Sequence, residues 1–378
     1  MLKGIYLTLM VGPAVPVPVP QMVLDALTEI SVTNAARSAS GFSLSFEISN
    51  RSPLQTLFML SQGAAIPLLR VVIVVTVNGT PEVLMDGVVT DHEIAPGVGD
   101  RPATLTITGS DLTAVMNYSL FSNPPATPFP AMPPFLRVLT ILGKYAPLGI
   151  IPEVIPSVLV DTPIPTDRIP MQQGTDLDYI QALADEVGYV FYLKPGPVPL
   201  TSRAYWGPEI KVGQPQRALN VDMDAYTNVE SLSFQYRPET KKIPVVTIQN
   251  KETKAPIPMP IPDITPLNPP LGAVPSLSYE LEYLSNAAKL SPTQAAVIGL
   301  AKAARYADVV SGSGSLDVLR YGQLLKAREL VGVRGAGMAF DGLHYVTSVT
   351  HTITRDSYKQ AFSLSRNGLL PTVNQVPA

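Results

Sequence analysis

The stretch DGLHYVTSVTHTI, Asp341–Ile353, resembles an earlier stretch of the same chain, DGVVTDHEI at Asp86–Ile94. Both begin with Asp-Gly, alternate apolar and polar side chains, and lead through a turn into a second alternating segment. These second segments are TLTITGSDL from Thr104 and AFSLSRNGL from Ala361. Successive side chains of a strand point to opposite faces, so such alternation predicts half-buried strands. The sequence therefore predicts two related β-hairpins, one in each half of the chain.

The composition indicates a protein that works in an assembly. The chain has 378 residues, of which 46% are hydrophobic and only 15% are charged, against roughly 25% charged residues in an average soluble domain. That length fits two or three domains of ordinary size. A surface with few charges tends to expose large apolar patches, and such patches mark contacts with other subunits. We therefore expect an oligomer or a component of a larger particle.

Charge and residue usage exclude several classes of function. The formal net charge of -3 provides no cluster of basic residues to hold a phosphate backbone, so stable nucleic-acid binding is not expected. The absence of cysteine excludes disulfides and thiolate metal sites. Apolar runs are interrupted well before the roughly 18 residues that a spanning helix needs, so no membrane insertion is expected.

Prolines and hydrophobic periodicity divide the chain into three parts. The 39 prolines gather in clusters, and because proline lacks an amide donor these clusters mark connections between elements. Residues 1–120 carry strand patterns typical of a small barrel or sandwich, 121–217 mix helical and strand patterns, and 218–378 return to strands. The last part also contains a predicted helix at 292–309 and a proline-rich loop at 255–275.

The middle part contains the clearest helix signal. In TDLDYIQALADEVGYVFYL, from Thr175, apolar residues recur at helical spacing and a strand pattern follows. Thr175 can cap the helix together with Asp178 three residues later, and Gly188 can end it. The sequence predicts a helix followed by a strand.

These segments resemble a known family. TDLDYIQALADEVGYVFYL resembles the helix and strand signature of the phage late control gene D family. FDGLHYVTSVTHTITRDSYKQAFSLSRNGL is similar to the closing hairpin of that family, which ends in Arg-Asn-Gly, and DGVVTDHEIAPGVGDRPATLTITGSDL resembles its earlier hairpin. The resemblance touches all three parts of the chain.

The resemblance implies a baseplate hub protein of a contractile tail or contractile injection system, related to the hub part of type VI secretion spike proteins. It implies a mainly β fold with an α+β insertion. Residues 1–120 would form a first tube-like β-barrel domain, 121–217 a smaller α+β connecting domain, and 218–378 a second tube-like β-barrel domain. Three chains with two barrels each would present six similar barrels. Such a homotrimer would be a symmetry adaptor between a sixfold inner tube and a threefold spike.

Partners and location follow from the same resemblance. The chain ends at Ala378 shortly after the closing hairpin, which implies a spike protein on a separate chain. The other expected partners are the inner tube protein and further baseplate proteins, with cargo or DNA passing through the lumen. Assembly is expected in the bacterial cytoplasm, and the final place is the baseplate of a phage tail or of an injection particle.

Catalytic and metal-binding patterns are weak, and we predict a protein that is not an enzyme and has no cofactor or metal. The alternative is an envelope or peptidoglycan-active glycoside hydrolase built on β-domains, with Asp185 or Glu186 as the acid; the solvated face of a helix explains these two carboxylates better. His92 and His351 occupy similar places in the two hairpins but lack partner ligands at metal-binding spacing.

Seven residues are expected to hold the fold together rather than to react. They are Asp86, Gly87, Asp341 and Gly342 at the starts of the hairpins, and Tyr179, Gly188 and Tyr189 in the middle part.

Overall fold

The structure is a computed structural model. It describes residues 4–13, 15–48, 68–97, 102–157, 162–166, 169–249, 256–261, 268–277, 280–283, 298–300, 302–304, 306–373 and 376.

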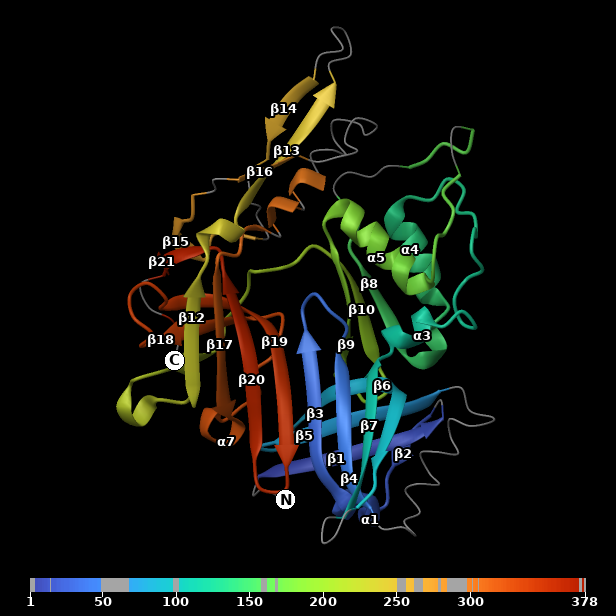
Figure 1. Cartoon of the computed structure of the whole chain (residues 1–378). Helices are drawn as coiled ribbons and strands as arrows, with labels where there is room; N and C mark the ends of the chain where they lie inside the picture. The colour runs from blue at the N-terminus through green and yellow to red at the C-terminus, as the bar shows by residue number, and fades with distance from the viewer. Residues whose placement is uncertain are drawn as a thin grey trace.

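One 13-stranded sheet forms the body of the protein (Figure 1). Its strands are β1 (Ile5–Pro13), β2 (Val17–Pro18), β3 (Leu27–Ala35), β4 (Gly41–Ile48), β5 (Leu69–Val77), β6 (Thr80–Ala95), β7 (Ala103–Asp111), β11 (Gln216–Asn220), β12 (Ser231–Tyr236), β17 (Val310–Asp317), β18 (Leu330–Arg334), β19 (Gly342–Thr354) and β20 (Tyr358–Arg366). Nearly all neighbours are antiparallel, and the mainly β class predicted from the alternating pattern is confirmed.

The two halves of the sheet have the same strand order. The first half runs β3-β4-β7-β6-β5-β1 and the second runs β12-β17-β20-β19-β18-β11. Chain order matches too: in each half the second strand along the chain pairs with the third, the sixth, fifth and fourth follow in that order, and the first strand pairs with the fourth. The halves differ at the last pair, which is antiparallel between β1 and β5 and parallel between β11 and β18.

Both predicted hairpins carry a β-bulge at an equivalent place. The register shifts between Val89 and Asp91 where β6 pairs with β7, and between Val346 and Ser348 where β19 pairs with β20. Superposing the bulges aligns Val89 with Val346. The two Asp-Gly pairs then differ by two positions, because the second copy has two more residues before its bulge. The repeat is real, but the alignment suggested by Asp-Gly is shifted.

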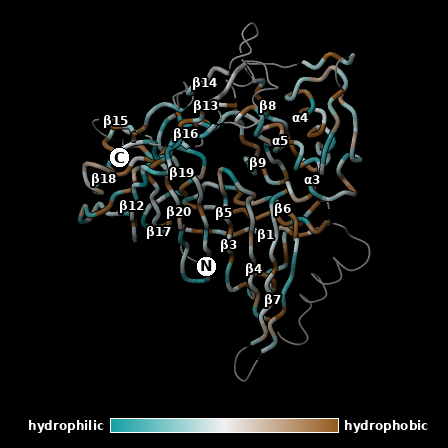
Figure 2. Tube along the Cα trace, turned by 45° about the horizontal axis from the view of Figure 1, so that its top comes forward, coloured by the Kyte–Doolittle hydropathy of each residue, from teal (hydrophilic) through white to brown (hydrophobic). Residues whose placement is uncertain are grey.

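The two halves are joined through β3 and β19, which pair antiparallel from Ser348 with Ala35 to Thr354 with Glu29. A single hydrophobic cluster lies beneath this junction and contains buried side chains of both halves, including Leu44, Phe46, Val349 and Phe362. The trace in Figure 2 alternates between hydrophobic and hydrophilic residues along these strands. The sequence alternation therefore does specify one buried and one polar face.

The middle module packs helices on a small sheet, as Figure 1 shows. The elements are α3 (Thr113–Asn117), α4 (Pro134–Gly143), α5 (Asp176–Val187), β8 (Ile150–Val154), β9 (Val190–Pro195) and β10 (Ser202–Gly207), with strand order β8-β10-β9. Its own hydrophobic cluster surrounds Trp206. The predicted cap of α5 is confirmed: Thr175 Oγ1 accepts from the Asp178 amide and Asp178 accepts from the Thr175 amide.

The segment between β12 and β17 is an insertion into the second half. It contains β13 (Lys242–Gln249), β14 (Pro256–Pro260), β15 (Gly272–Pro275) and β16 (Glu280–Tyr283), and β15 pairs with β21 (Gly368–Pro371). The proline-rich segment expected as a loop thus contains two strands. Alternate prolines at 256, 258 and 260 can all face the outer edge, because an antiparallel strand presents its amides to each edge in turn.

Two further predictions, one helix and the domain boundaries, are tested by the described residues only in part or not at all. The predicted helix at 292–309 is helical wherever it is described between 298 and 306, while 292–297 lie outside the described residues. The domain boundaries at 120 and 217 remain predictions. The smaller helices are α1 (Gln21–Ala26) and α7 (Val318–Tyr321).

Candidate functional site

A hydroxyl-rich sheet face runs across both halves. The strand registers place two rows of side chains side by side: Thr352, Ser31, Ser43, Thr108 and Asp91 in one, and Ser233, Ser313, Ser363 and Ser348 in the other. These side chains are half-buried or exposed. Hydroxyls also meet across strands, with Thr33 Oγ1 3.0 Å from Thr350 Oγ1. The face thus offers many weak hydrogen-bonding groups and few fixed charges.

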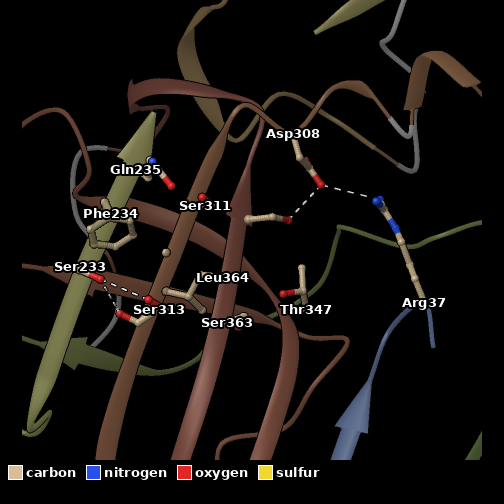
Figure 3. A pocket seen from close by; sticks show the side chains of 12 residues that line it. Arg37, Ser233, Phe234, Gln235, Asp308, Ser311, Ser313, Thr347, Ser363 and Leu364 are labelled. Carbon is tan, nitrogen blue, oxygen red and sulfur yellow. Dashed lines mark hydrogen bonds and ion pairs between the residues drawn. The ribbon is translucent and has the colours of Figure 1, made fainter. Parts of the chain in front are cut away.

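The face is hollowed beside β12, where a cavity of about 710 Å³ lies over β12, β17 and β20 (Figure 3). Ser233, Gln235, Ser311 and Ser363 line it, and Arg37 and Asp308 lie at one side. The cavity is open, and six of its twelve lining residues are serine or threonine. Its two charged lining residues, Arg37 and Asp308, lie 3.7 Å apart and offset each other's charge.

A cluster of four charged side chains joins the three parts of the chain at this cavity. Arg37, from the β3–β4 turn, donates to both carboxylate oxygens of Glu209 at 3.2 and 2.6 Å. Lys211 Nζ lies 2.7 and 2.8 Å from the two oxygens of Asp308, and the Lys211 side chain is only 1% exposed. Burial alone would raise the pKa of Asp308, but Lys211 and Arg37 hold that pKa below its ordinary value. These ion pairs therefore connect the first half, the middle module and the second half at one place.

A second buried ion pair joins the first half to the middle module. Asp86 accepts from Arg70 Nε at 2.7 Å and from Arg70 Nη2 at 2.6 Å, with both side chains almost fully buried. Arg70 also donates to the backbone oxygens of Leu148 and Leu200 in the module. Asp86 was predicted to matter, but the sequence did not indicate Arg70 as its partner.

The other hairpin-start residues have separate roles. A Cβ at Gly87 would lie 2.2 Å from the Ser110 backbone oxygen, so only glycine fits between these strands. Gly342 has φ +116, a backbone conformation that is strained for any residue with a side chain. Asp341 accepts from the Ala336 amide at 2.8 Å and stabilises the preceding turn. The two Asp-Gly pairs therefore resemble each other in sequence but not in contacts.

The three residues predicted in the middle module lie around α5. The Tyr179 hydroxyl accepts from Arg137 at 3.2 Å, and its ring stacks on Phe129. Gly188 ends α5 in the left-handed conformation, with φ 71. Tyr189 packs edge-on against Trp206 with ring centroids 4.9 Å apart. The structure brings these three together in the middle module, to which Asp86 of the first hairpin is linked through Arg70.

The sequence analysis did not single out Asp176, the first residue of α5. Asp176 is fully buried and accepts from the Asn123 amide, from Gln172 at 2.7 Å and from the Tyr145 hydroxyl at 2.8 Å. Lys144 Nζ lies 2.6 Å away. Gln172 is four residues away, but Asn123, Lys144 and Tyr145 are distant in the chain, so no local pattern could identify the full set.

The Arg-Asn-Gly segment that closes the second hairpin fixes the insertion to the sheet. Arg366 donates to the Asp341 backbone oxygen at 2.8 Å. Asn367 Oδ1 accepts from the Leu271 amide at 2.8 Å, and Gly368 lies so close to Gly272 that a Cβ on Gly272 would be 2.3 Å from it. The Arg-Asn-Gly segment thus links the end of β20 to Asp341 and to the residues at the start of β15.

Two histidines are buried in the second half. Burial lowers the pKa of His351 to about 4 and, with the nearby Arg366 charge, the pKa of His344 to about 3. His351 Nδ1 lies 2.8 Å from the Tyr358 hydroxyl. His92 is half-buried on β6 and pairs with Ile107, so it aligns with Val349 and not with His351.

We expect acid to weaken the fold through His351. The unfolded chain takes up a proton near pH 6.5 while the folded histidine stays neutral down to about pH 4, so stability is full above pH 6.5 and falls as the pH drops between these values. Between pH 7 and 4.5 the loss from this residue is about 2–3 kcal/mol. Urea unfolding at both pH values should show a smaller acid loss in His351→Gln than in the native chain. His92→Gln is the control; an acid loss equal in all three proteins would contradict the prediction.

The candidate acids of the enzymatic alternative lie on the exposed side of α5. Asp185 and Glu186 are both exposed, and as consecutive helical residues they point in different directions. Within the described ranges, no three His, Asp or Glu side chains are grouped to hold a metal ion. No helix in the described part of the chain is long and apolar enough to cross a membrane.

Comparison with known proteins gives matches at the level of structure. No family model and no curated protein sequence matches the chain. The tail protein from Neisseria meningitidis MC58 is 12% identical, with a TM-score of 0.63 over 97% of this chain and 98% of its own. The 43 kDa tail protein of prophage MuSo2 from Shewanella oneidensis is 15% identical, with a TM-score of 0.58 over 96% and 98%.

A secretion protein shares the same fold. The Escherichia coli c3393 protein, a component of the type VI secretion system with similarity to the bacteriophage T4 tail proteins gp27 and gp5, is 12% identical, with a TM-score of 0.53 over 93% of this chain and 76% of its own. The chain thus has the fold of phage tail and type VI secretion proteins, in agreement with its sequence resemblance to the late control gene D family.

Proposed function

We propose that the protein is the structural central hub of a contractile tail or injection-system baseplate. It would act as a trimeric symmetry adaptor between a sixfold inner tube and a threefold spike on a separate chain. It catalyses no reaction in this role. The fold shared with phage tail and type VI secretion proteins supports a place in such a particle.

The observation that carries this proposal is the internal repeat. One chain contains the same six-strand order twice, and the two copies are joined where β3, at the end of the first order, pairs with the part of β19 from Ser348 to Thr354. A threefold assembly of such chains presents six equivalent modules, which can face a sixfold partner on one side and a threefold partner on the other. In this assembly each repeat forms one tube-like β-barrel wall.

The hydroxyl-rich face suits the lumen of that ring. Its charged positions include the acidic Glu29, Asp91 and Glu93, which share the face with Ser and Thr rows. Lys359 on the same face is paired with Glu230 at 2.8 Å. Acidic and hydroxyl groups repel or bind a phosphate backbone weakly, so DNA or polar cargo could move along the wall without being held.

Mass measurement and imaging of the purified chain test the proposal. We expect light scattering to give three times the chain mass of 40.5 kDa and electron microscopy to show a ring with threefold symmetry and six similar modules. The expected cause is burial of the low-charge surface between subunits. A monomer at micromolar concentration, or a ring of another symmetry, would contradict the trimeric hub.

A further inference from the structure

Among the described residues, two strand edges have no paired neighbour: the outer edge of β12 in the second repeat, and the last part of β6 in the first. β12 pairs with β17 on one side, and no described strand lies on its other side. β6 pairs with β5 only as far as Val88, and beyond its bulge the described strands pair with it on the β7 side alone. Figure 1 places β12 at one side of the body and β6 and β7 toward the other.

The junction inside the chain uses the counterparts of these same two elements. β3 stands at one end of the spatial strand order of the first repeat, as β12 does in the second, and β19 corresponds to β6 by its bulge. β19 pairs with β18 before its bulge and with β3 after it. β6 corresponds to β19, and β19 pairs with β3 after its bulge. By this analogy, the part of β6 after its bulge is the place where a strand equivalent to β3 can pair.

We propose that β12 of one copy adds antiparallel to the Asp91–Ala95 part of β6 in the next copy. This inference rests on the proposed hub function and specifies its subunit contact. The occupant is a second copy of this chain, because the chain itself contains the complementary edge. Each chain then contributes one internal and one intermolecular junction of the same kind, and three chains make six.

The internal register predicts the intermolecular one. Pairing across β4 and β17 aligns Ser31 with Ser233, and the bulges align Ser348 with Asp91. If β12 of one copy pairs with β6 of the next in the register that β3 has with β19, four pairs lie opposite each other: Asp91 with Arg237, Glu93 with Gln235, Ile94 with Phe234, and Ala95 with Ser233.

The chemistry of these pairs is complementary, although the alignment used no side-chain chemistry. Asp91 and Arg237 are both exposed and carry opposite charges. Ile94 and Phe234 are partly buried against the same hydrophobic cluster, so their contact would extend that cluster across the subunit boundary. Glu93 and Gln235 lie on the polar face, as Thr350 and Thr33 do in the internal junction. Opposite-charge and apolar cross-strand pairs both stabilise a sheet.

Cysteine cross-linking tests the register directly, because the native chain contains no cysteine. Under mild oxidation we expect the Glu93→Cys/Gln235→Cys variant to give covalent dimers and trimers on non-reducing gels. Thr33→Cys/Thr350→Cys, the equivalent internal pair, should form a disulfide within one chain. Glu93→Cys/Ser231→Cys, shifted by four residues on the same face, should remain unlinked.

Charge reversal gives an independent measurement. Asp91→Arg and Arg237→Asp should each raise the trimer dissociation constant at least about tenfold, because like charges would then face each other. The double variant should restore most of the native affinity. A native trimer in which Glu93→Cys/Gln235→Cys stays unlinked and the reversals do not compensate would overturn strand addition and leave the hub intact. Absence of any trimer in the native protein would instead overturn the hub.

Discussion

Replacing Asp86 with alanine should lower the free energy of unfolding by about 3–5 kcal/mol. The substitution leaves the Arg70 guanidinium, whose side chain is 5% exposed, without its carboxylate partner. A buried charge without a partner keeps its desolvation cost and loses the attraction that offset it. The effect should spread to the middle module, since Arg70 also donates to the backbone oxygens of Leu148 and Leu200.

Urea unfolding followed by the fluorescence of Trp206 measures this change, because Trp206 is the single tryptophan and lies fully buried in the middle module. Glu230→Ala is the matched control. It removes the carboxylate of a surface ion pair with Lys359, whose side chain is 48% exposed, and should cost less than about 1 kcal/mol. The double variant Arg70→Met/Asp86→Leu should lose less than Asp86→Ala. Equal losses for Asp86→Ala and Glu230→Ala would show that the buried pair is not what stabilises this contact.

Local patterns in the sequence predicted the local structure well. Alternation specified strands in both Asp341–Ile353 and Asp86–Ile94, since period-two patterning leaves few alternatives. Burial follows the alternation in the later part of β19, whereas residues 86–89 of β6 are buried on both faces. Thr175 and Gly188 marked the two ends of α5 because capping depends on a few adjacent residues. Dense prolines did mark connections between elements. They also led to the prediction of a loop where the structure has β14, because alternate prolines are compatible with pairing on one edge.

Register and long-range charge pairing could not be obtained in this way. The Asp-Gly dipeptides suggested an alignment of the repeats that differs by two residues from the alignment of their bulges, because the second copy has two more residues before its bulge and a bulge leaves no composition signal. Arg37, Glu209 and Asp308 are far apart in the chain, and none belongs to a motif. Their meeting depends on how the three parts pack, which is a tertiary property.

The two buried ion pairs hold the three parts of the chain in a fixed relation. Asp86 and Arg70 connect the first half to the middle module, and Lys211 and Asp308 connect the module's exit to the start of β17 in the second half. A ring built from repeated modules needs each module to present its edges at one angle, because a small error in angle prevents closure. Ion pairs with little freedom to rearrange suit that requirement.

Replacing Asp308 with alanine should therefore cost about 3–5 kcal/mol of folding stability. Lys211, 1% exposed, would retain Glu209 Oε2 at 3.8 Å and the Tyr345 ring, whose centroid is 5.4 Å away, but no close carboxylate. Arg37 and Ser365 would each lose a contact as well. Glu280→Ala is the control: its ion pair with Lys242 spans 3.0 Å, but the two side chains are 61% and 40% exposed, so the cost should be below about 1 kcal/mol.

The double variant Lys211→Met/Asp308→Leu distinguishes the loss of stability caused by an unpaired buried charge from the loss caused by missing side-chain packing. It leaves Arg37 paired with both oxygens of Glu209 and removes the buried cation together with its partner, so it should be more stable than Asp308→Ala. Urea midpoints of the single, double and control variants, compared at one pH near 7, give the measurement. If Asp308→Ala is no less stable than Glu280→Ala, the charge cluster contributes nothing to joining the parts. The angle between the repeats must then be set by the β3–β19 pairing and the hydrophobic cluster beneath it.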